Sequence, residues 1–517
     1  MKLTIITITM KKPLTTIFLT ACALCASATD YYVSPDGAGT KDGTSWENAW
    51  DLATFQGKCS QNNTNFANRD NVYFAAGTYV PTATLYFYLG VNLLGAEGVE
   101  RTVFSGDKTL IGQSGKRDRL FQISTATLNG DTEKPINISN IDFKDLSLTQ
   151  NSEGNATVGA IYMDNSGALV TIRNCNFTNI DNAGQGGSAL LARRSTVKFV
   201  DCTFTNIKAK NRGVVARLIS NDSNKGFTTF EHCYFADNEA TGTTDAPCGL
   251  VIMHHGKELN FSNCTFVNNK INGKGASIWN GTAPDAIYAR ALNVTNCLFY
   301  NNSSADNLNV VANSATTETN NVKHEYNTSI SAAINISSVG VGTYYLSLPF
   351  TMPTGVTGKT FSSITGSRLI EGTTYKAGDV VPAGTALLVE GAEGTYHPIV
   401  AEDDNSAPTN MLSGSDLGAT TTGEGKHYKL ANGESGLAFY YGATDGAAFT
   451  NAAHKAWLVV PEAEAEARFF FSFSDDDVTG VECITKQTTP QDGKFMENGR
   501  MVILKNGVKY NAVGQKL

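Results

Sequence analysis

The sequence predicts an all-β protein that contains a parallel β-helix, a β-sandwich and a small C-terminal hairpin module. A phrase that reads roughly Asn-Cys-x-Phe-x-Asn recurs five times in register, and its cysteines are Cys175, Cys202, Cys233, Cys264 and Cys297. Internal repeats of about 20–50 residues are typical of solenoids and propellers. Cys and Phe are two residues apart, so on a strand they share one face and can fill the interior of stacked coils. The repeat therefore predicts coils stacked about 4.8 Å apart.

The repeated cysteine is predicted to be a structural side chain. Residues 138–143 form an earlier copy of the phrase in which Ile141 takes the cysteine position, so any small apolar side chain will serve. Five cysteines at one repeated position favour a buried column of reduced thiols over disulfides, because buried Cys behaves as a small apolar residue. No Cys-x-x-Cys or Cys/His ligand spacing is present, so we expect no metal site.

Composition and charge limit the class of partner. The 517 residues include 49 Gly and only 13 Pro, 17% are charged, and the net charge is −8. This is a turn-rich, extracellular type of composition. Nucleic-acid-binding domains usually carry a basic footprint, so nucleic acid is not expected as a partner.

The N-terminus has the pattern of a secretion signal over residues 1–28. Lys11 and Lys12 precede an apolar run at 14–24, and cleavage is favoured after Ala28. Residues 19–22 also resemble a lipobox, which would make Cys22 a lipidated first residue. No other stretch approaches the ~18 apolar residues of a membrane span. We expect a protein that is secreted or held at the outer-membrane surface.

The first folded segment is predicted to cap the solenoid. Residues 44–47 read as a capping box, and Trp46, Ala49, Trp50 and Ala53 give a helical apolar stripe. A lid over the open end of the coils is preferred to a tryptophan-based sugar site.

Residues 31–37, 43–49 and 76–79 resemble the opening of secreted right-handed parallel β-helix proteins. That superfamily includes pectate-lyase-like enzymes and polymorphic surface proteins. The resemblance covers about residues 30–330 and implies a right-handed single-stranded β-helix, which we assign to residues 30–333 with its N-terminal cap helix.

The periodicity changes near Asn335. Residues 344–350, 386–390 and 456–460 read as strands of a β-sandwich at 335–478, and residues 314–335 as a last loose coil or linker. The boundary is predicted to separate two independently folded units. The sandwich resembles a module near the C-terminus of secreted proteins of gut-type Gram-negative anaerobes.

In the tail, 479–517, two Asn-Gly dipeptides predict hairpins. The tail resembles C-terminal sorting-type modules of the same bacteria.

Enzymes of the β-helix superfamily work on the outer wall of the coils. Lyases need a Lys or Arg base near a carboxylate or Ca²⁺, and hydrolases need a pair of carboxylates. The Asn-Thr-Asp, Gly-His-Gly and Arg-Ile-Lys phrases of polygalacturonases are absent from the coils, and Asp475, Asp476 and Asp477 belong to the second domain. Catalytic residues therefore stay unassigned, no cofactor is expected, and Ca²⁺ is not indicated.

One cluster of charged and aromatic residues is the candidate ligand surface. Aligning the coils on their cysteines brings Asp164 and Asn165 level with Arg193, Arg194, Arg217, His254, His255 and Trp279. Lys208, Lys210, Arg212 and Lys257 lie in adjoining turns. A column of Arg, His and Trp can hold an anionic or stacked sugar. The plain alternative is a solvated outer face.

Two functions follow from these patterns. The favoured one is a non-catalytic surface protein, a glycan-binding or adhesin-like scaffold whose partner is a polysaccharide or a host or cell-surface glycan. The alternative is a polysaccharide lyase or glycoside hydrolase that acts on an acidic polysaccharide. We expect a monomer.

Overall fold

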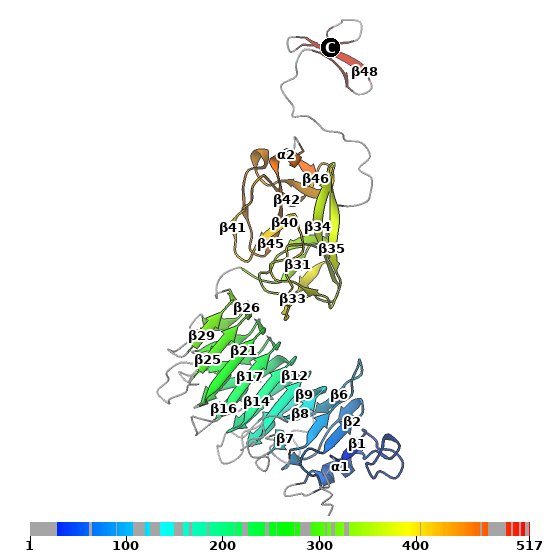
Figure 1. The fold of residues 1–517 in the computed structure, drawn as a ribbon, viewed down its shortest axis with the longest axis vertical. Coiled ribbons are helices and arrows are strands. Elements are labelled where there is room, and N and C mark those ends of the chain that lie inside the picture. The colour runs from blue at the N-terminus through cyan, green and yellow to red at the C-terminus, as the bar shows by residue number, and fades with distance from the viewer. Residues whose placement is uncertain are drawn as a thin grey trace, which may run out of the picture.

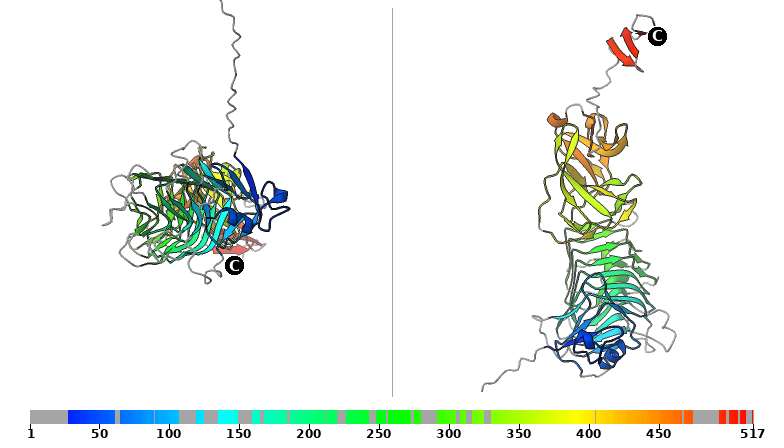
Figure 2. Two further views of the ribbon diagram at one scale, coloured as in Figure 1. Left: turned by 90° about the horizontal axis from the view of Figure 1, so that it is seen from below. Right: turned by 90° about the vertical axis from the view of Figure 1, so that its right-hand side faces the viewer.

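The computed structural model describes residues 28–517 except for 61–64, 89, 107–118, 125–134, 149–158, 165–167, 184–185, 211, 220–225, 243–247, 255, 273–274, 280–290, 305–307, 312–315, 325–329, 404, 466–467, 474–492, 498–499, 506–507, 512–515 and 517. The protein is all-β, with a parallel β-helix followed by antiparallel sheets (Figure 1). The antiparallel sheets of residues 334–473 stack on one end of the coils (Figure 2). The predicted signal segment, 1–28, lies almost wholly outside the described residues. Among the described helices, none is long and apolar enough to cross a membrane.

Three parallel sheets form the walls of the β-helix. The first sheet contains β1 (Asp30–Val33), β2 (Asn71–Phe74), β5 (Asn92–Leu94), β8 (Ile136–Ser139), β11 (Leu169–Arg173), β14 (Thr196–Val200), β17 (Phe227–Glu231), β21 (Glu258–Ser262), β25 (Ala291–Thr295) and β29 (Thr316–Thr319). The second sheet contains β4 (Leu85–Phe87), β7 (Arg119–Ile123), β10 (Gly159–Asp164), β13 (Leu190–Arg193), β16 (Arg212–Ile219), β20 (Cys248–His254), β24 (Gly275–Trp279) and β28 (Leu308–Val311). The third sheet contains β3 (Gly77–Tyr79), β6 (Thr102–Ser105), β9 (Ile141–Leu148), β12 (Asn176–Asn182), β15 (Thr203–Ala209), β18 (Tyr234–Ala236), β22 (Thr265–Val267), β26 (Leu298–Tyr300) and β30 (Val322–Lys323), with short side strands β19 (Glu239–Ala240), β23 (Lys270–Ile271) and β27 (Ser303–Ser304).

The repeated phrase sets the corners of each coil. In the first copy, Asn174 and Asn179 both have left-handed backbone conformations, with φ of 49° and 56°. Asn and Asp tolerate this region far better than branched residues do, because their short polar side chains bond locally. Equivalent positions in later copies repeat it, with φ of 50–55° at Asp201, Asn206, His232, Asp237, Asn263, Asn268, Asn296 and Asn301. The polar ends of the phrase therefore turn the chain, and its Cys and Phe face inward.

Aligned columns fill the interior. Phenylalanine rings stack with neighbouring centroids 4.5–5.2 Å apart along Phe143, Phe177, Phe204, Phe235, Phe266 and Phe299. The five repeat cysteines are fully buried and free, as predicted, and each Sγ lies 3.3–3.4 Å from the carbonyl oxygen two residues earlier. Burial raises the pKa of Cys175, Cys233 and Cys264 well above its usual value.

A buried asparagine column runs beside the third sheet. Asn238 Nδ2 donates to Asn269 Oδ1, and Asn269 Nδ2 donates to Asn302 Oδ1, each at 2.9 Å. The same amides donate to backbone carbonyls, at 2.9 Å for Asn238 to Phe204 and for Asn269 to Phe235. These bonds satisfy polar groups that would be costly to bury alone.

The N-terminal cap differs from its predicted form. A 3₁₀ turn, η1 (Trp46–Asn48), precedes α1 (Leu52–Lys58), and Asp51 caps α1 by accepting from Thr54 N at 2.7 Å. The predicted capping box is wrong, because the Thr44 hydroxyl instead donates to Asp42. Trp50 and Phe55 join the core of the coils, so the cap covers their end.

Two antiparallel sheets dominate the second part. One contains β32 (Val341–Tyr344), β37 (Leu387–Gly391), β34 (Val356–Thr365) and β35 (Arg368–Tyr375), and the other β40 (Leu412–Ser415), β45 (Lys455–Val460), β42 (Lys426–Gly433), β43 (Gly436–Tyr441) and β46 (Phe470–Phe471). Their side chains share one core that includes Phe361, Leu388, Tyr428, Phe439 and Leu458, which makes a β-sandwich. Smaller elements are β31 (Ile334–Ile336), β33 (Phe350–Thr351), β36 (Val380–Val381), β38 (Gly394–Tyr396), β39 (Ile399–Val400), β41 (Ala419–Thr420), η4 (Thr444–Gly446), β44 (Thr450–Asn451) and α2 (Glu462–Ala465).

The tail forms the predicted hairpins, β47 (Gly493–Glu497), β48 (Arg500–Lys505) and β49 (Val508–Asn511), which pair antiparallel. Asp475, Asp476 and Asp477 lie outside the described residues. The sorting role of the tail stays a prediction.

The coils and the sandwich share a hydrophobic cluster. Val267, Leu298 and Tyr300 of the third sheet are buried in the same cluster as Leu348 and Phe350 of the second part. Across this boundary Val400 N donates to Thr265 Oγ1 at 3.0 Å. Within the predicted loose coil, β29 and β30 still pair with the coil before them.

Candidate functional site

The candidate site lies on the outer face of the second sheet. Residues alternate along its strands, so in β13 Leu190 and Ala192 belong to the core whereas Leu191 and Arg193 face outward. In β16, Ala216 and Leu218 are core residues and Arg217 faces outward.

Strand register corrects the predicted column. Asp164 pairs with Arg193, Arg193 with Ile219, and Ile219 with His254. Arg217 instead pairs with Leu191 and Ile252, and Ile252 pairs with Trp279. The single predicted column is therefore wrong. Asp164, Arg193 and His254 belong to one column of paired positions, and Arg217 and Trp279 belong to another, two positions away along the strands. The side chains of His254 and Trp279, and the whole of Asn165 and His255, lie outside the described part of the chain.

Arg194 lies just beyond β13 and is exposed. Its Nη2 forms an ion pair with Asp164 Oδ1 at 3.0 Å. Asp164 also accepts a hydrogen bond from the Tyr162 hydroxyl at 3.1 Å. The carboxylate nearest the arginines therefore already has two partners.

Three arginines, Arg193, Arg212 and Arg217, form what we call the arginine cluster. Arg217 is only 7% exposed, although it faces outward. Its Nε and Nη1 atoms, and the Nε atoms of Arg193 and Arg212, are buried and make no hydrogen bond within the described residues. A buried charged group without partners is costly, so such groups often mark function.

Burial and neighbouring charge act together on Arg217. Its pKa is lowered to about 10, first by burial and then by the positive charges of Arg212 and Arg193. The chain packs closely over it at Gly187, where an added Cβ would lie 3.2 Å from the Cβ atoms of both Arg217 and Leu191. Gly187 also has a φ of +78°, so both space and backbone conformation require glycine there.

Tyr162 borders the arginine cluster. The Arg119 guanidinium lies over its ring at 4.8 Å, and Arg119 Nη1 donates to Gln122 Oε1 at 2.8 Å. Burial, and then the charge of Asp164, raise the pKa of the Tyr162 phenol. The phenol therefore stays protonated at neutral pH and is a hydrogen-bond donor there. Among the described residues, no group of three or more His, Cys, Asp or Glu could hold a metal ion.

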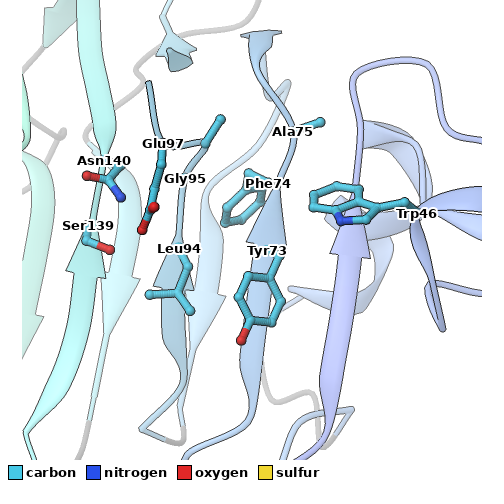
Figure 3. A pocket seen from close by; sticks show the side chains of 10 residues that line it. Trp46, Tyr73, Phe74, Ala75, Leu94, Gly95, Glu97, Ser139 and Asn140 are labelled. Atoms are coloured by element: carbon cyan, nitrogen blue, oxygen red, sulfur yellow. The ribbon is translucent and has the colours of Figure 1, made fainter. Parts of the chain in front are cut away.

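A cavity on another sheet was missed by the sequence analysis. A cavity of about 370 Å³ lies on the first sheet beside the cap, with Trp46 at one side and Glu97 and Asn140 at the other (Figure 3). Trp46 was assigned to the apolar stripe of the lid, but it is 45% exposed. The sequence did contain one signal of an aromatic surface. Tyr32 and Tyr73 each alternate with inward apolar residues along their strands, so both face outward, and the Tyr32 ring contacts Trp46.

Comparison with known proteins found no matching family model and no matching curated protein. Solved structures gave distant matches. The ORF18 protein of Geobacillus virus E2 is 12% identical, with 76% of this chain and 80% of that chain covered and a TM-score of 0.19. Pantoea stewartii WceF, described as a glycan biofilm modifying enzyme with a tailspike-like parallel β-helix, is 14% identical, with 90% and 66% covered and a TM-score of 0.21.

The tailspike protein gp49 of the Acinetobacter baumannii bacteriophage Fri1, a capsular polysaccharide depolymerase, is 11% identical, with 63% and 78% covered and a TM-score of 0.16. At TM-scores this low, none of these proteins supports an inference about the function of this chain.

Proposed function

We propose that this chain is a secreted or cell-surface β-helix protein that binds an acidic polysaccharide on the outer face of its second sheet. One observation carries the proposal: the buried guanidinium of Arg217 has Nε and Nη1 without partners and lies beside two further arginines. A carboxylate or sulfate of a glycan bound to the partly exposed Arg193 and Arg212 would supply the missing negative charge beside Arg217.

The chemistry of arginine suits this partner. The guanidinium is planar and can bind carboxylate or sulfate through two parallel hydrogen bonds. Neighbouring coils lie about 4.8 Å apart, so arginines on successive strands can contact successive sugars of one chain. The whole protein has a net charge of −8, so attraction for a polyanion has to be local to the cluster.

Binding without cleavage is the better-supported form of this function. The raised pKa of Tyr162 keeps its phenol protonated, so it is not a ready general base. Asp164 is engaged by Arg194 and Tyr162. A lyase or hydrolase that acts on the same acidic polysaccharide is the alternative, and an assay for cleavage products of the same polymers separates the two.

The test is titration calorimetry of the full mature chain with polygalacturonate, alginate and heparin, and with dextran as a neutral polymer. We expect one acidic polymer to bind and Arg217→Met to weaken its binding by about 1.5–3 kcal/mol, the contribution of a hydrogen-bonded charged contact. The matched control is Arg173→Ala, because Arg173 is exposed on the first sheet and pairs with Asp201 at 2.9 Å.

Equal binding by wild type, Arg217→Met and Arg193→Ala would place the ligand elsewhere, and no binding to any polyanion would reject the proposal. Ultraviolet absorbance from new double bonds, or a rise in reducing ends, would favour the enzyme over the scaffold.

A further inference from the structure

The cavity beside the cap has an aromatic side. Tyr32, Tyr73 and Leu94 occupy paired positions on neighbouring strands of the first sheet, and all face outward. The Tyr32 and Tyr73 rings stack with centroids 5.5 Å apart and planes 19° apart. Trp46 meets Tyr32 edge to face, with centroids 4.9 Å apart, and its indole projects toward Tyr73 in Figure 3. The result is an apolar platform that is open to solvent.

The opposite side of the cavity is polar. Ser139 continues the outward column next to Leu94, and Asn140 follows it at the corner of the coil with a φ of 59°. Asn140 Oδ1 accepts from Asn174 Nδ2 at 2.7 Å, which fixes the orientation of its amide. In Figure 3 the amide nitrogen of Asn140 is on the side toward the Glu97 carboxylate. An acceptor and a donor therefore lie together across from the aromatic rings.

The charge around the cavity selects against a polyanion. Glu97 and Glu100 are both exposed on the loop that forms its polar side. The nearby cation, Arg101, is already paired with Asp142 at 2.8 Å and donates to the carbonyl of Asn174. An acidic polysaccharide would be repelled here, whereas an uncharged ligand with hydroxyl groups would not.

We propose that this cavity is a binding site for a neutral pyranose ring of a glycan, separate from the arginine cluster. A pyranose has an apolar face of C–H groups that can lie on Trp46 and Tyr73, and hydroxyls at its edge that can donate to Glu97 and accept from Asn140. Ligand sites commonly combine an aromatic lining with a few polar groups that fix orientation, in cavities of about 300–1,000 Å³. The volume of about 370 Å³ accommodates one ring of an oligosaccharide that extends along the open sides.

The two sites lie on different walls. The cavity is built on the first sheet and the corner that leads to the third, whereas the arginine cluster belongs to the second sheet. The inference therefore does not depend on binding of an acidic polysaccharide. If both hold, the protein contacts two chemically different parts of a glycan surface.

The test is a titration of the full mature chain with neutral hexasaccharides of glucose, mannose, galactose and xylose, followed by tryptophan emission and by calorimetry. We expect at least one hexasaccharide to bind, to change the emission, and to lose about tenfold in affinity in Trp46→Ala, which corresponds to about 1.4 kcal/mol. Glu97→Ala, an exposed loop position, is expected to weaken the same ligand severalfold without disturbing the cap.

Two controls separate this site from other effects. Val99→Ser changes a residue that is 99% exposed on the same loop and does not line the cavity, so it should bind as wild type does. Binding of acidic polymers should be the same in wild type and Trp46→Ala. The proposal is overturned if no neutral hexasaccharide binds, or if Trp46→Ala and Glu97→Ala both bind it as tightly as wild type.

Discussion

Arg217 illustrates how a single residue can be retained at a cost in stability. The unfolded chain would keep its guanidinium at the ordinary pKa, whereas the folded chain lowers that pKa to about 10. At neutral pH this difference costs the folded state about 3 kcal/mol, since one pKa unit is about 1.4 kcal/mol. A bound anion would remove most of this cost.

Arg217→Met is therefore expected to stabilise the free protein by about 1–3 kcal/mol while it weakens binding of the acidic glycan. The measurement is urea unfolding of wild type and variant at neutral pH, with no ligand present. The wild type should also gain stability as pH rises above about 10, because the unfolded state still binds the guanidinium proton that the folded state has lost. A less stable variant would mean that Arg217 has a structural partner.

The five repeat cysteines are expected to resist chemical modification in the folded protein. Their thiols are fully buried, and burial holds the pKa of Cys175, Cys233 and Cys264 high, so little thiolate forms. Labelling with a maleimide should be slow in the native state and complete in denaturant. A mass that indicates two or more disulfides among Cys175, Cys202, Cys233, Cys264 and Cys297 would contradict this.

The asparagine column joins each coil to the next through side-chain hydrogen bonds. Replacing Asn269 with Leu would remove four side-chain hydrogen bonds, to the backbone N–H and side-chain amide of Asn238, the carbonyl of Phe235 and the oxygen of Asn302. The Asn238 amide would still donate to Phe204 and the Asn302 oxygen would still accept from the backbone of residue 269, so the backbone N–H of Asn238 and the carbonyl of Phe235 lose most. Each orphaned buried group costs about 1–3 kcal/mol, so we expect Asn269→Leu to destabilise by at least 2 kcal/mol.

The control for the asparagine column is Asn272→Ala. Asn272 is only half-buried and bonds to Glu239 at 3.0 Å, so its loss should cost less than about 1 kcal/mol. Chemical unfolding of both variants gives the comparison. Equal stability of the two would show that the column is not a source of stability.

The elements of the coils were predictable because their signals are local. Each copy of the phrase spans six residues. Its polar end residues adopt the left-handed conformation that turns the chain, and its Cys and Phe point inward from the strand, so corner and strand can both be predicted from the phrase alone. The register of the second sheet was not predictable, because the repeat length varies from 27 to 33 residues. Between β16 and β20 an extra residue enters at Gly213–Ala216, which shifts the pairing. The rough alignment on the cysteines also grouped Arg217 with Arg193, although in the pairing of β13 with β16 Arg193 lies opposite Ile219 and Arg217 lies opposite Leu191.

The burial of Arg217 and the exposure of Trp46 were likewise beyond sequence reasoning. An outward position on a strand indicates solvent unless another segment covers it, and Gly187 covers Arg217 through a long-range contact. Trp46 satisfies the helical spacing of the lid, but the chain forms a 3₁₀ turn there and α1 begins only at Leu52. Both cases depend on tertiary structure rather than on local pattern.

At the scale of the whole molecule, two histidines connect the coils to the sandwich. His324 follows β30 and His454 precedes β45, both are buried, and their Nε2 atoms are in hydrogen-bonding contact. His454 Nδ1 donates to the carbonyl of Tyr345 at 3.0 Å, so its Nε2 must accept and that of His324 must donate. Protonation of His454 at Nε2 would turn two N–H groups toward each other, whereas protonation of His324 would add a buried positive charge beside it.

The protein is therefore expected to lose stability in acid. The pKa of both His324 and His454 is lowered to about 4, chiefly by burial, with Asp416 and Lys455 as the nearest charged groups. Between pH 6.5 and 4 the unfolded state binds protons that the folded state does not, so stability falls by up to about 3 kcal/mol per histidine as pH decreases. Melting temperatures at pH 7 and 4.5 measure the effect.

His324→Gln keeps a neutral N–H donor, so it should match wild type at pH 7 and lose less stability at pH 4.5. An equal loss in both proteins would assign the acid sensitivity to other groups. His397, whose pKa is also lowered by burial, is the next candidate.

The sandwich is expected to be required for the solubility of the coils. The sequence alone predicted independent units, but Val267, Leu298 and Tyr300 are outward-facing residues of the third sheet that are buried against the second part. A chain that ends at residue 333 would expose this apolar surface together with the last coil, and such patches promote association. We expect the shortened chain to aggregate, as measured by light scattering, and a version with Val267→Thr and Leu298→Thr to aggregate less. A shortened chain that stays monomeric and melts cooperatively would instead establish that the coils fold alone, and that the shared hydrophobic cluster only orients the sandwich on them.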